Sequence, residues 1–195
     1  MKNIKNDEKY SFYRLTKDDI IYRRWDIKYF NSKGKVSFRN DQPYWFTTKK
    51  YIKGINIPGS TRAYSPKKHI DLFDISNKNN IKKLLKSDIP IKIKEMIQKL
   101  TGIGLTQLNN NFCGYTNKLP NQLVWCSAPE QKDIPSSGID GIIVKFVAKY
   151  FNCDGYIVKN AHHIRNKKIL KYQTEFAIIN PQRKLNVLYG DKQPN

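Results

Sequence analysis

The stretch that decides the fold is Tyr172-Gln173-Thr174-Glu175-Phe176-Ala177-Ile178-Ile179, near the C-terminal end of the sequence. Residues 176–179 are aromatic, small or β-branched, and Asn180-Pro181 ends the run, so a buried strand is predicted. Glu175 carries a carboxylate into this apolar element. Burying a carboxylate is costly unless a cation or hydrogen-bond donors compensate it. Two interpretations follow: Glu175 belongs to a structural ion pair, or it acts at the rim of a cleft.

Length and composition indicate one folded domain over residues 1–195. Hydrophobic residues make up 39% of the chain and aromatic residues 12%, and a chain of this length buries roughly 70% of its unfolded surface. Residues 1–9 are expected to be a loose lead-in and residues 101–137 an insertion with short elements such as 122–126. No apolar run approaches the ~18 residues of a membrane span, and no apolar segment follows the charged N-terminus, so neither a span nor a signal peptide is predicted.

The charge is strongly unbalanced. Thirty-six Lys and Arg face sixteen Asp and Glu, which gives a formal net charge of +20. A field of that size attracts polyanions, so nucleic acid is the leading partner class and an anionic membrane surface the second. A Lys-, Asn- and Ile-rich composition is also typical of AT-rich genomes, viral ones included, and this origin is the alternative explanation of the charge.

The cysteines and histidines favour neither disulfides nor a metal. Three widely spaced cysteines with no Cys-x-x-Cys pair (Cys113, Cys126 and Cys153) predict free thiols in a reducing, intracellular compartment, cytoplasmic or nuclear. His162 and His163 are adjacent in a basic stretch, which indicates solvent or phosphate contact rather than a ligand set. No P-loop, dinucleotide-binding Gly-x-Gly-x-x-Gly, zincin or Gly-x-Ser-x-Gly motif is present.

The periodicity of apolar residues predicts an α+β chain. The predicted strands are 10–15, 20–27, 43–48, 69–75, 156–158 and 185–189, and the predicted helices are 80–87, 91–100 and 139–152. Ser76-Asn77 is expected to cap the first helix, and the lysine-rich faces of the first two helices are expected to be solvated surface. Residues 56–65 and 159–168 are predicted to be loops.

Three short motifs, in order along the chain, suggest a family. Tyr22-Arg23 lies in an early strand, Phe46-Thr47-Thr48 ends an aromatic strand, and Gln173-Thr174-Glu175 enters the late strand. With Asp154-Gly155-Tyr156-Ile157 before the late strand, residues 20–190 resemble the ADP-ribosyltransferase superfamily, in its arginine–serine–glutamate branch with a Gln-x-Glu motif. The resemblance implies split, mainly antiparallel β-sheets that form a central cleft with flanking helices.

The sequence departs from the family pattern near the arginine and the serine. Arg24 stands where a glycine often follows the arginine, and Thr47 replaces the usual serine. Arg14, in Tyr13-Arg14, is a second candidate for the first-strand arginine. Because strand residues alternate, one of Arg23 and Arg24 is expected to face the core or a cleft and the other solvent, although both could extend outward.

The resemblance also implies the cofactor, NAD, and the roles of the site residues. Glu175 would stabilise the oxocarbenium-like charge on the ribose when the nicotinamide bond breaks. Arg23 would bind the pyrophosphate, and Thr47 would brace Glu175 with support from Thr48. Tyr51 or Tyr64 would stack on nicotinamide, and Gln173 would orient the acceptor. The alternative for Thr47 or Thr48 is a hydroxyl cap on the following turn.

The resemblance leaves several classes of acceptor open. In the family, Gln at the first motif position occurs in enzymes that modify non-arginine protein side chains and in enzymes that modify guanine in nucleic acid. The charge and the many aromatics favour DNA or RNA. Protein acceptors stay open, as do a non-enzymatic nucleic-acid-binding protein with a structural Glu175–Arg23 ion pair and a metal-dependent nuclease built on His162, His163 and Glu175.

Overall fold

The computed structural model describes residues 10–25, 38, 40–48, 60–101, 114–116, 119–126, 138–165 and 168–190. The strands are β1 (Phe12–Leu15), β2 (Ile21–Trp25), β3 (Pro43–Thr47), β4 (Ser60–Pro66), β5 (Ile70–Asp74), β6 (Gly114–Thr116), β7 (Leu119–Cys126), β8 (Gly155–Arg165), β9 (Lys168–Ile179) and β10 (Leu185–Gly190). The helices are α1 (Lys78–Lys86), α2 (Ile91–Thr101), α3 (Gly138–Tyr150) and α4 (Pro181–Lys184). Helices and strands are mixed, as the predicted α+β class requires.

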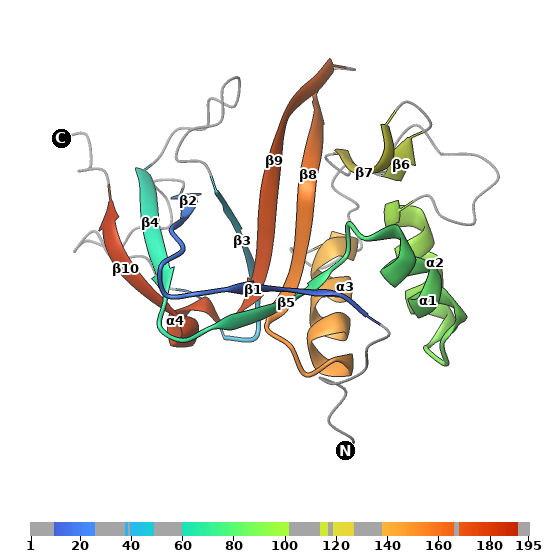
Figure 1. Cartoon of the computed structure of the whole chain (residues 1–195), viewed down its shortest axis with the longest axis horizontal. Coiled ribbons are helices and arrows are strands. Elements are labelled where there is room, and N and C mark those ends of the chain that lie inside the picture. Colours follow the sequence, from blue (N-terminus) through green and yellow to red (C-terminus); the bar gives the residue numbers. More distant parts are fainter. Residues whose placement is uncertain are drawn as a thin grey trace.

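The described strands form one curled sheet in the order β1-β5-β8-β9-β3-β2-β4-β10, and β7 adds to β8 and carries β6. Most neighbours are antiparallel, whereas β5 and β7 each pair with β8 in parallel. Figure 1 shows β3, β9 and β8 in the middle, β2, β4 and β10 on one side, and the helices α1 to α3 on the other. The strands β2, β3 and β9, which carry the three sequence motifs, are therefore consecutive neighbours.

Two hydrophobic cores lie on opposite faces of the central strands. The helix-side core joins α1, α2 and α3 to the sheet through residues such as Leu84, Ile97, Val147, Val158 and Ala177. The far-side core contains Phe46, Tyr64, Ile157, Phe176 and Ile178. Along β9 the side chains alternate between them, and residues 176 to 178 are each at most 1% exposed. The predicted burial of this strand on both faces is confirmed.

Most predicted elements are present, and their bounds agree within two residues for the helices and for the strands 10–15, 20–27, 43–48, 69–75 and 185–189. Asn77 caps α1 as expected, because its side chain accepts hydrogen bonds from the backbone N–H groups of Asn79 and Asn80. In the predicted insertion, the short element expected near 122–126 is part of β7, which extends the sheet alongside β8.

Two predicted loops are wrong. Residues 60–65 of the loop predicted over 56–65 belong to β4, which hydrogen-bonds to β2 and β10. Pro66 ends this strand rather than interrupting it. The loop predicted over 159–168 is the continuation of β8 to Arg165 and the start of β9 at Lys168. The polar, basic sequence of this segment does not indicate a strand. The strand is held by backbone hydrogen bonds to β7 and β9, and side-chain hydrophobicity carries no signal for those bonds. His162 and His163 consequently lie within β8.

Candidate active site on the central strands

A row of directly paired residues crosses the middle of the sheet. Tyr22 of β2 pairs with Thr47 of β3, Thr47 pairs with Glu175 of β9, and Glu175 pairs with Val158 of β8. Residues opposite each other in an antiparallel pair point to the same face, with Cβ atoms roughly 5 Å apart. The structure thus brings two of the sequence-predicted site residues, Thr47 and Glu175, into side-by-side positions.

The row lies on the helix side of the sheet. Val158 and Ala177, which share the face of Glu175, both belong to the core beneath α1 to α3. Glu175 is 6% exposed and Thr47 is half-buried. A carboxylate at the margin of an apolar core, beside a hydroxyl-bearing neighbour, has the environment in which a fixed negative charge acts strongly on a nearby cation.

An irregularity in β8 adjoins this row. Ala161 pairs with Gln173 and Val158 with Glu175, so three steps along β8 match two along β9. One extra residue on a strand bends it and increases the local twist, and such bulges are over-represented next to active sites.

Arg23 is placed differently from the expectation. Strand alternation puts it on the face opposite Tyr22, and its guanidinium donates a 2.7 Å hydrogen bond to the carbonyl of Trp45 and lies 5.1 Å from the ring centre of Tyr44. Tyr44 packs on the far-side core. The expected convergence of Arg23 with Thr47 and Glu175 is therefore corrected: they occupy opposite faces.

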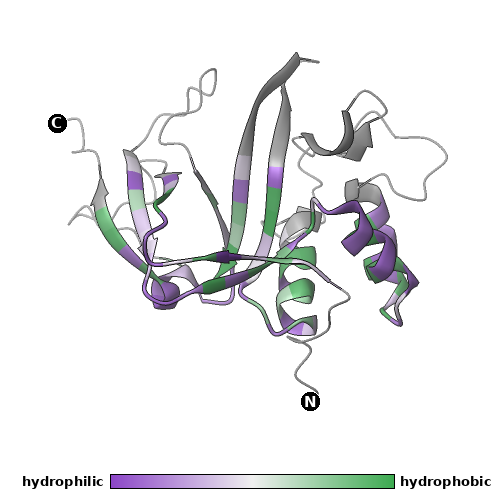
Figure 2. Ribbon diagram, viewed as in Figure 1, coloured by the Kyte–Doolittle hydropathy of each residue, from purple (hydrophilic) through white to green (hydrophobic). Residues whose placement is uncertain are grey.

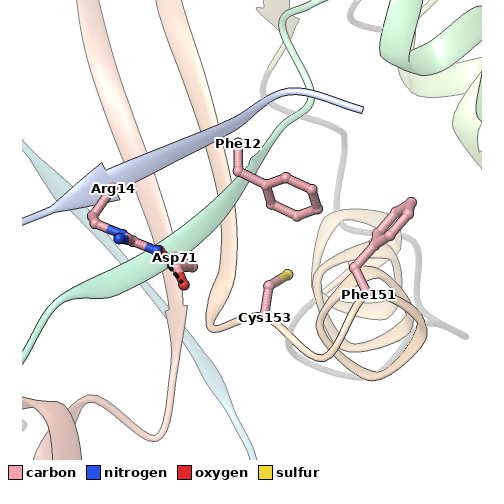
Figure 3. Close-up of a pocket in the computed structure, with 5 residues that line it drawn as sticks. All are labelled: Phe12, Arg14, Asp71, Phe151 and Cys153. Carbon is pink, nitrogen blue, oxygen red and sulfur yellow. Dashed lines mark hydrogen bonds and ion pairs between the residues drawn. The ribbon is translucent and has the colours of Figure 1, made fainter. Parts of the chain in front are cut away.

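Arg14, the alternative arginine, is engaged elsewhere. It donates to both carboxylate oxygens of Asp71, at 2.7 and 3.3 Å, and this hydrogen bond and the attraction of the carboxylate raise the pKa of Arg14. Its strand, β1, is separated from β9 by β5 and β8. Arg14 and Asp71 border a pocket with Phe12, Phe151 and Cys153 (Figure 3). The pocket holds about 80 Å³, well below the ~300 Å³ at which ligand pockets begin, so a dinucleotide does not fit there.

The tyrosines and Thr48 complete the set of expected residues. Tyr64 is only 1% exposed and packs edge-on against Phe46 in the far-side core, so its expected stacking on nicotinamide is wrong. Thr48 is exposed directly after β3. Tyr51 lies outside the described residues, and so does the turn after Thr48 that Thr47 or Thr48 was expected to cap.

Two features near Glu175 were not predicted. Gly155, at the start of β8, has φ of +148°, and a Cβ atom there would lie 1.8 Å from the carbonyl oxygen of Ala177. Next to Val158, Lys159 binds the buried Asp74 at 2.7 Å, and its backbone N–H donates to the Ser76 hydroxyl at 3.1 Å. These contacts fix β8 against β9 and β5 on either side of the row. The Asp-Gly pair is a sequence signal for the tight start of β8 at Gly155, whereas the contacts of Lys159 join segments that are distant in sequence.

Within the described ranges, no group of three or more His, Cys, Asp or Glu residues is arranged to hold a metal ion. No helix in the same ranges has the length and apolar character needed to cross a membrane. Comparison with protein-family models, curated proteins and solved structures gave no match to this chain. The sequence motifs and the strand register are therefore the observations from which a function can be argued.

Proposed function

We propose that this chain is an NAD-dependent mono-ADP-ribosyltransferase with an ADP-ribosyltransferase-like fold, and that it modifies DNA or RNA. The observation that carries the proposal is the register of three neighbouring strands. β2 holds the arginine motif, β3 ends at Thr47 of the Thr-Thr motif, and β9 holds the Gln-x-Glu motif. The three strands adjoin in that order, and Thr47 is paired with Glu175. Motifs separated by more than a hundred residues in sequence thus meet in one part of the sheet.

The proposed reaction breaks the bond between the nicotinamide nitrogen and C1′ of the ribose in NAD. Positive charge then develops on C1′ and the ring oxygen, and an acceptor atom forms the new bond to C1′ while it loses its proton. Nicotinamide leaves as a neutral molecule. A carboxylate held in a water-poor site stabilises that charge most when it cannot reorganise. Glu175, at 6% exposure, would do so while it accepts a hydrogen bond from a ribose hydroxyl.

The neighbours of Glu175 have roles that match their positions. Thr47 lies directly opposite it, so its hydroxyl would hold the carboxylate in one orientation, with Thr48 in support at the end of the strand. Gln173, two residues before Glu175 in the Gln-x-Glu motif, would orient the acceptor. Both are positioning roles for which a side-chain hydroxyl and an amide are suited.

The arginine assignment changes with the register. A guanidinium binds a pyrophosphate through paired hydrogen bonds, and this contact is useful only on the face that holds Glu175. Arg23 lies on the opposite face against Trp45 and Tyr44. Arg23 therefore ties β2 to β3 rather than binding the pyrophosphate. Arg23→Lys should chiefly lower stability and leave KM for NAD unchanged.

The nucleic-acid acceptor follows from the net charge of +20 and from Gln173 in place of a glutamate. A strongly basic surface binds phosphate backbones without regard to sequence, which leaves base selection to the site. Arginine side chains of proteins would be repelled by the same surface, which argues against them as acceptors.

Labelled NAD tests the proposal directly. The protein is incubated with NAD labelled in its adenylate part, and with single-stranded DNA, duplex DNA, RNA or a mixed protein extract in separate reactions. Label on one of the nucleic acids, lost in Glu175→Gln, is the expected result. Label on protein alone would overturn the acceptor, and no label with no nicotinamide release would overturn the transferase assignment. Cleavage of nucleic acid with Mg²⁺ and without NAD would indicate a nuclease instead.

A further inference from the structure

One face of α1 carries a stripe of lysines that the proposed chemistry does not use. The α1 lysine stripe consists of Lys78, Lys82, Lys83 and Lys86. The last three are exposed and Lys78 is half-buried. Asn80, Ile81 and Leu84 occupy the opposite, buried arc. Figure 2 shows the concentration of hydrophilic residues on the α1–α2 pair. Residues 78–98 hold six lysines against two acidic residues, Asp88 and Glu95.

Part of the stripe works against the stability of its own helix, although Lys83 and Lys86 lie in the last turn, where the helix dipole favours cations. Lys78 stands in the first turn, where the positive end of the helix dipole disfavours cations, and this turn contains no acidic residue. The pairs Lys78/Lys82 and Lys82/Lys86 are four residues apart, and like charges at that spacing cost about 0.2–0.5 kcal/mol each. A sequence shaped only by stability and solubility would mix glutamates into this face. A face of this composition would suit an anionic partner.

The position of α1 relates the stripe to the candidate site. Ile81 and Leu84 of α1 belong to the same core as Val158 and Ala177, which flank Glu175 on the helix side of the sheet. α1 therefore packs on the face of the sheet toward which Glu175 points, and its exposed lysine arc is turned away from the sheet. In Figure 1, α1 and α2 stand beyond α3 and β8 at the outer margin of that side.

The dimensions of the stripe suit a chain of phosphates. Lysines at 78, 82 and 86 rise about 6 Å per step and about 12 Å in total. One nucleic-acid strand presents a phosphate about every 3.4 Å of helix axis, so the stripe spans about three phosphates. Lysine ammonium groups bind phosphates as point charges, which gives affinity without sequence preference.

We propose that the α1 lysine stripe is the docking surface for the phosphate backbone of a nucleic acid, which it holds on the Glu175 side of the sheet. The inference rests on the proposed function only for the statement that the docked strand is the acceptor. Binding itself requires neither NAD nor catalysis.

The test uses a triple variant, Lys82→Gln/Lys83→Gln/Lys86→Gln, with Lys17→Gln/Lys68→Gln/Lys149→Gln as the matched control. Both remove three exposed lysines and the same charge, and glutamine is as good a helix former as lysine. Binding of a fluorescent single-stranded DNA of about 20 nucleotides is measured by anisotropy across a range of salt concentrations. Thermal melting of both variants shows that they are folded at the temperature of the binding measurement.

The stripe variant should bind at least about tenfold more weakly near 0.1 M salt, and the slope of log K against log salt should fall by about 2, since each lost phosphate contact removes roughly 0.7. The control should keep most of the slope. Equal losses in both variants would overturn the proposal, because the charge would then act as a diffuse field. Loss of binding to phosphatidylserine vesicles with DNA binding unchanged would also overturn it, in favour of a membrane surface.

The experiment distinguishes failure of the docking proposal from failure of the proposed function. Nicotinamide release from NAD without nucleic acid should persist in the stripe variant, and DNA binding should persist in Glu175→Gln. If the chain shows no NAD chemistry but the stripe variant alone loses DNA binding, the docking surface stands and the transferase assignment falls.

Discussion

Gly155→Ala is the substitution whose effect the structure determines most closely. The added Cβ atom would lie 1.8 Å from the carbonyl oxygen of Ala177 and 2.9 Å from its carbonyl carbon. Both atoms are backbone in β9, which is paired on both sides, with β8 and β3. Neither atom can move aside as a side chain would, so β8 and β9 must separate or the start of β8 must change conformation.

The cost has two parts. A φ of +148° is a region that residues with a Cβ rarely adopt, and such strain costs about 1–3 kcal/mol. Forcing atoms into a packed interior costs a similar amount. Because relief of one partly relieves the other, we expect a loss of about 3 kcal/mol in the free energy of unfolding. For a chain of this size, that lowers Tm by roughly 6–12 °C.

Thermal melting by circular dichroism measures the shift. Asn152→Gly is the control: Asn152 is exposed with φ of 48°, so glycine there should change stability by less than about 1 kcal/mol. Since Ala177 is two residues from Glu175, Gly155→Ala should also slow nicotinamide release below its melting temperature. A Gly155→Ala chain that melts with the parent would refute the close approach of β8 to β9.

Two further predictions concern buried polar groups. Asn80→Asp should lower the free energy of unfolding, measured in urea, by at least about 3 kcal/mol. The Nδ2 group of Asn80 donates hydrogen bonds to the carbonyls of Ser11 and Asp74 at 2.8 and 2.9 Å, and in the variant a carboxylate oxygen would face these carbonyls instead. Unchanged stability would contradict these hydrogen bonds. Burial raises the pKa of the Cys153 thiol from 9.0 to about 11, so the folded chain keeps a proton that the unfolded chain releases above pH 9. The stabilisation from this thiol should be complete below pH 9 and should fade toward pH 11. Over that interval, the difference in free energy of unfolding between the parent and Cys153→Ala should change by up to about 3 kcal/mol. A constant difference would contradict the burial of the Cys153 thiol.

The sequence predicts the central strand well because its signals are local. Residues 176–179 and the Asn-Pro stop mark a buried strand without any knowledge of its neighbours, and the apolar stripes of α1, α2 and α3 mark helices in the same way. The strand over residues 60–66 was not predicted because its stability comes from backbone pairing with β2 and β10, and its polar side chains give no sequence signal of a strand. The basic continuation of β8 to Arg165 was missed for the same reason.

The geometry of the candidate site depends on strand register, which local sequence patterns do not indicate. Motif order along the chain suggested that Thr47 and Glu175 act together, and the register places them opposite each other. The arginine depends on register to a single residue, because a shift of one moves a side chain to the other face. The face on which Arg23 lies is undetermined until β2 is paired with β3, at Tyr22 and Thr47. Thr47 and Glu175 are 128 positions apart, and no short-range pattern encodes their contact.

The rate of nicotinamide release by Glu175→Gln tests the central claim most directly, when it is measured beside the Tm of the same protein. If Glu175 stabilises the developing charge on the ribose, the rate should fall by about 10²–10³-fold while the chain stays folded. If Glu175 is instead half of a structural ion pair, the substitution should cost about 3–5 kcal/mol of stability. A release rate equal to that of the parent chain would contradict the account.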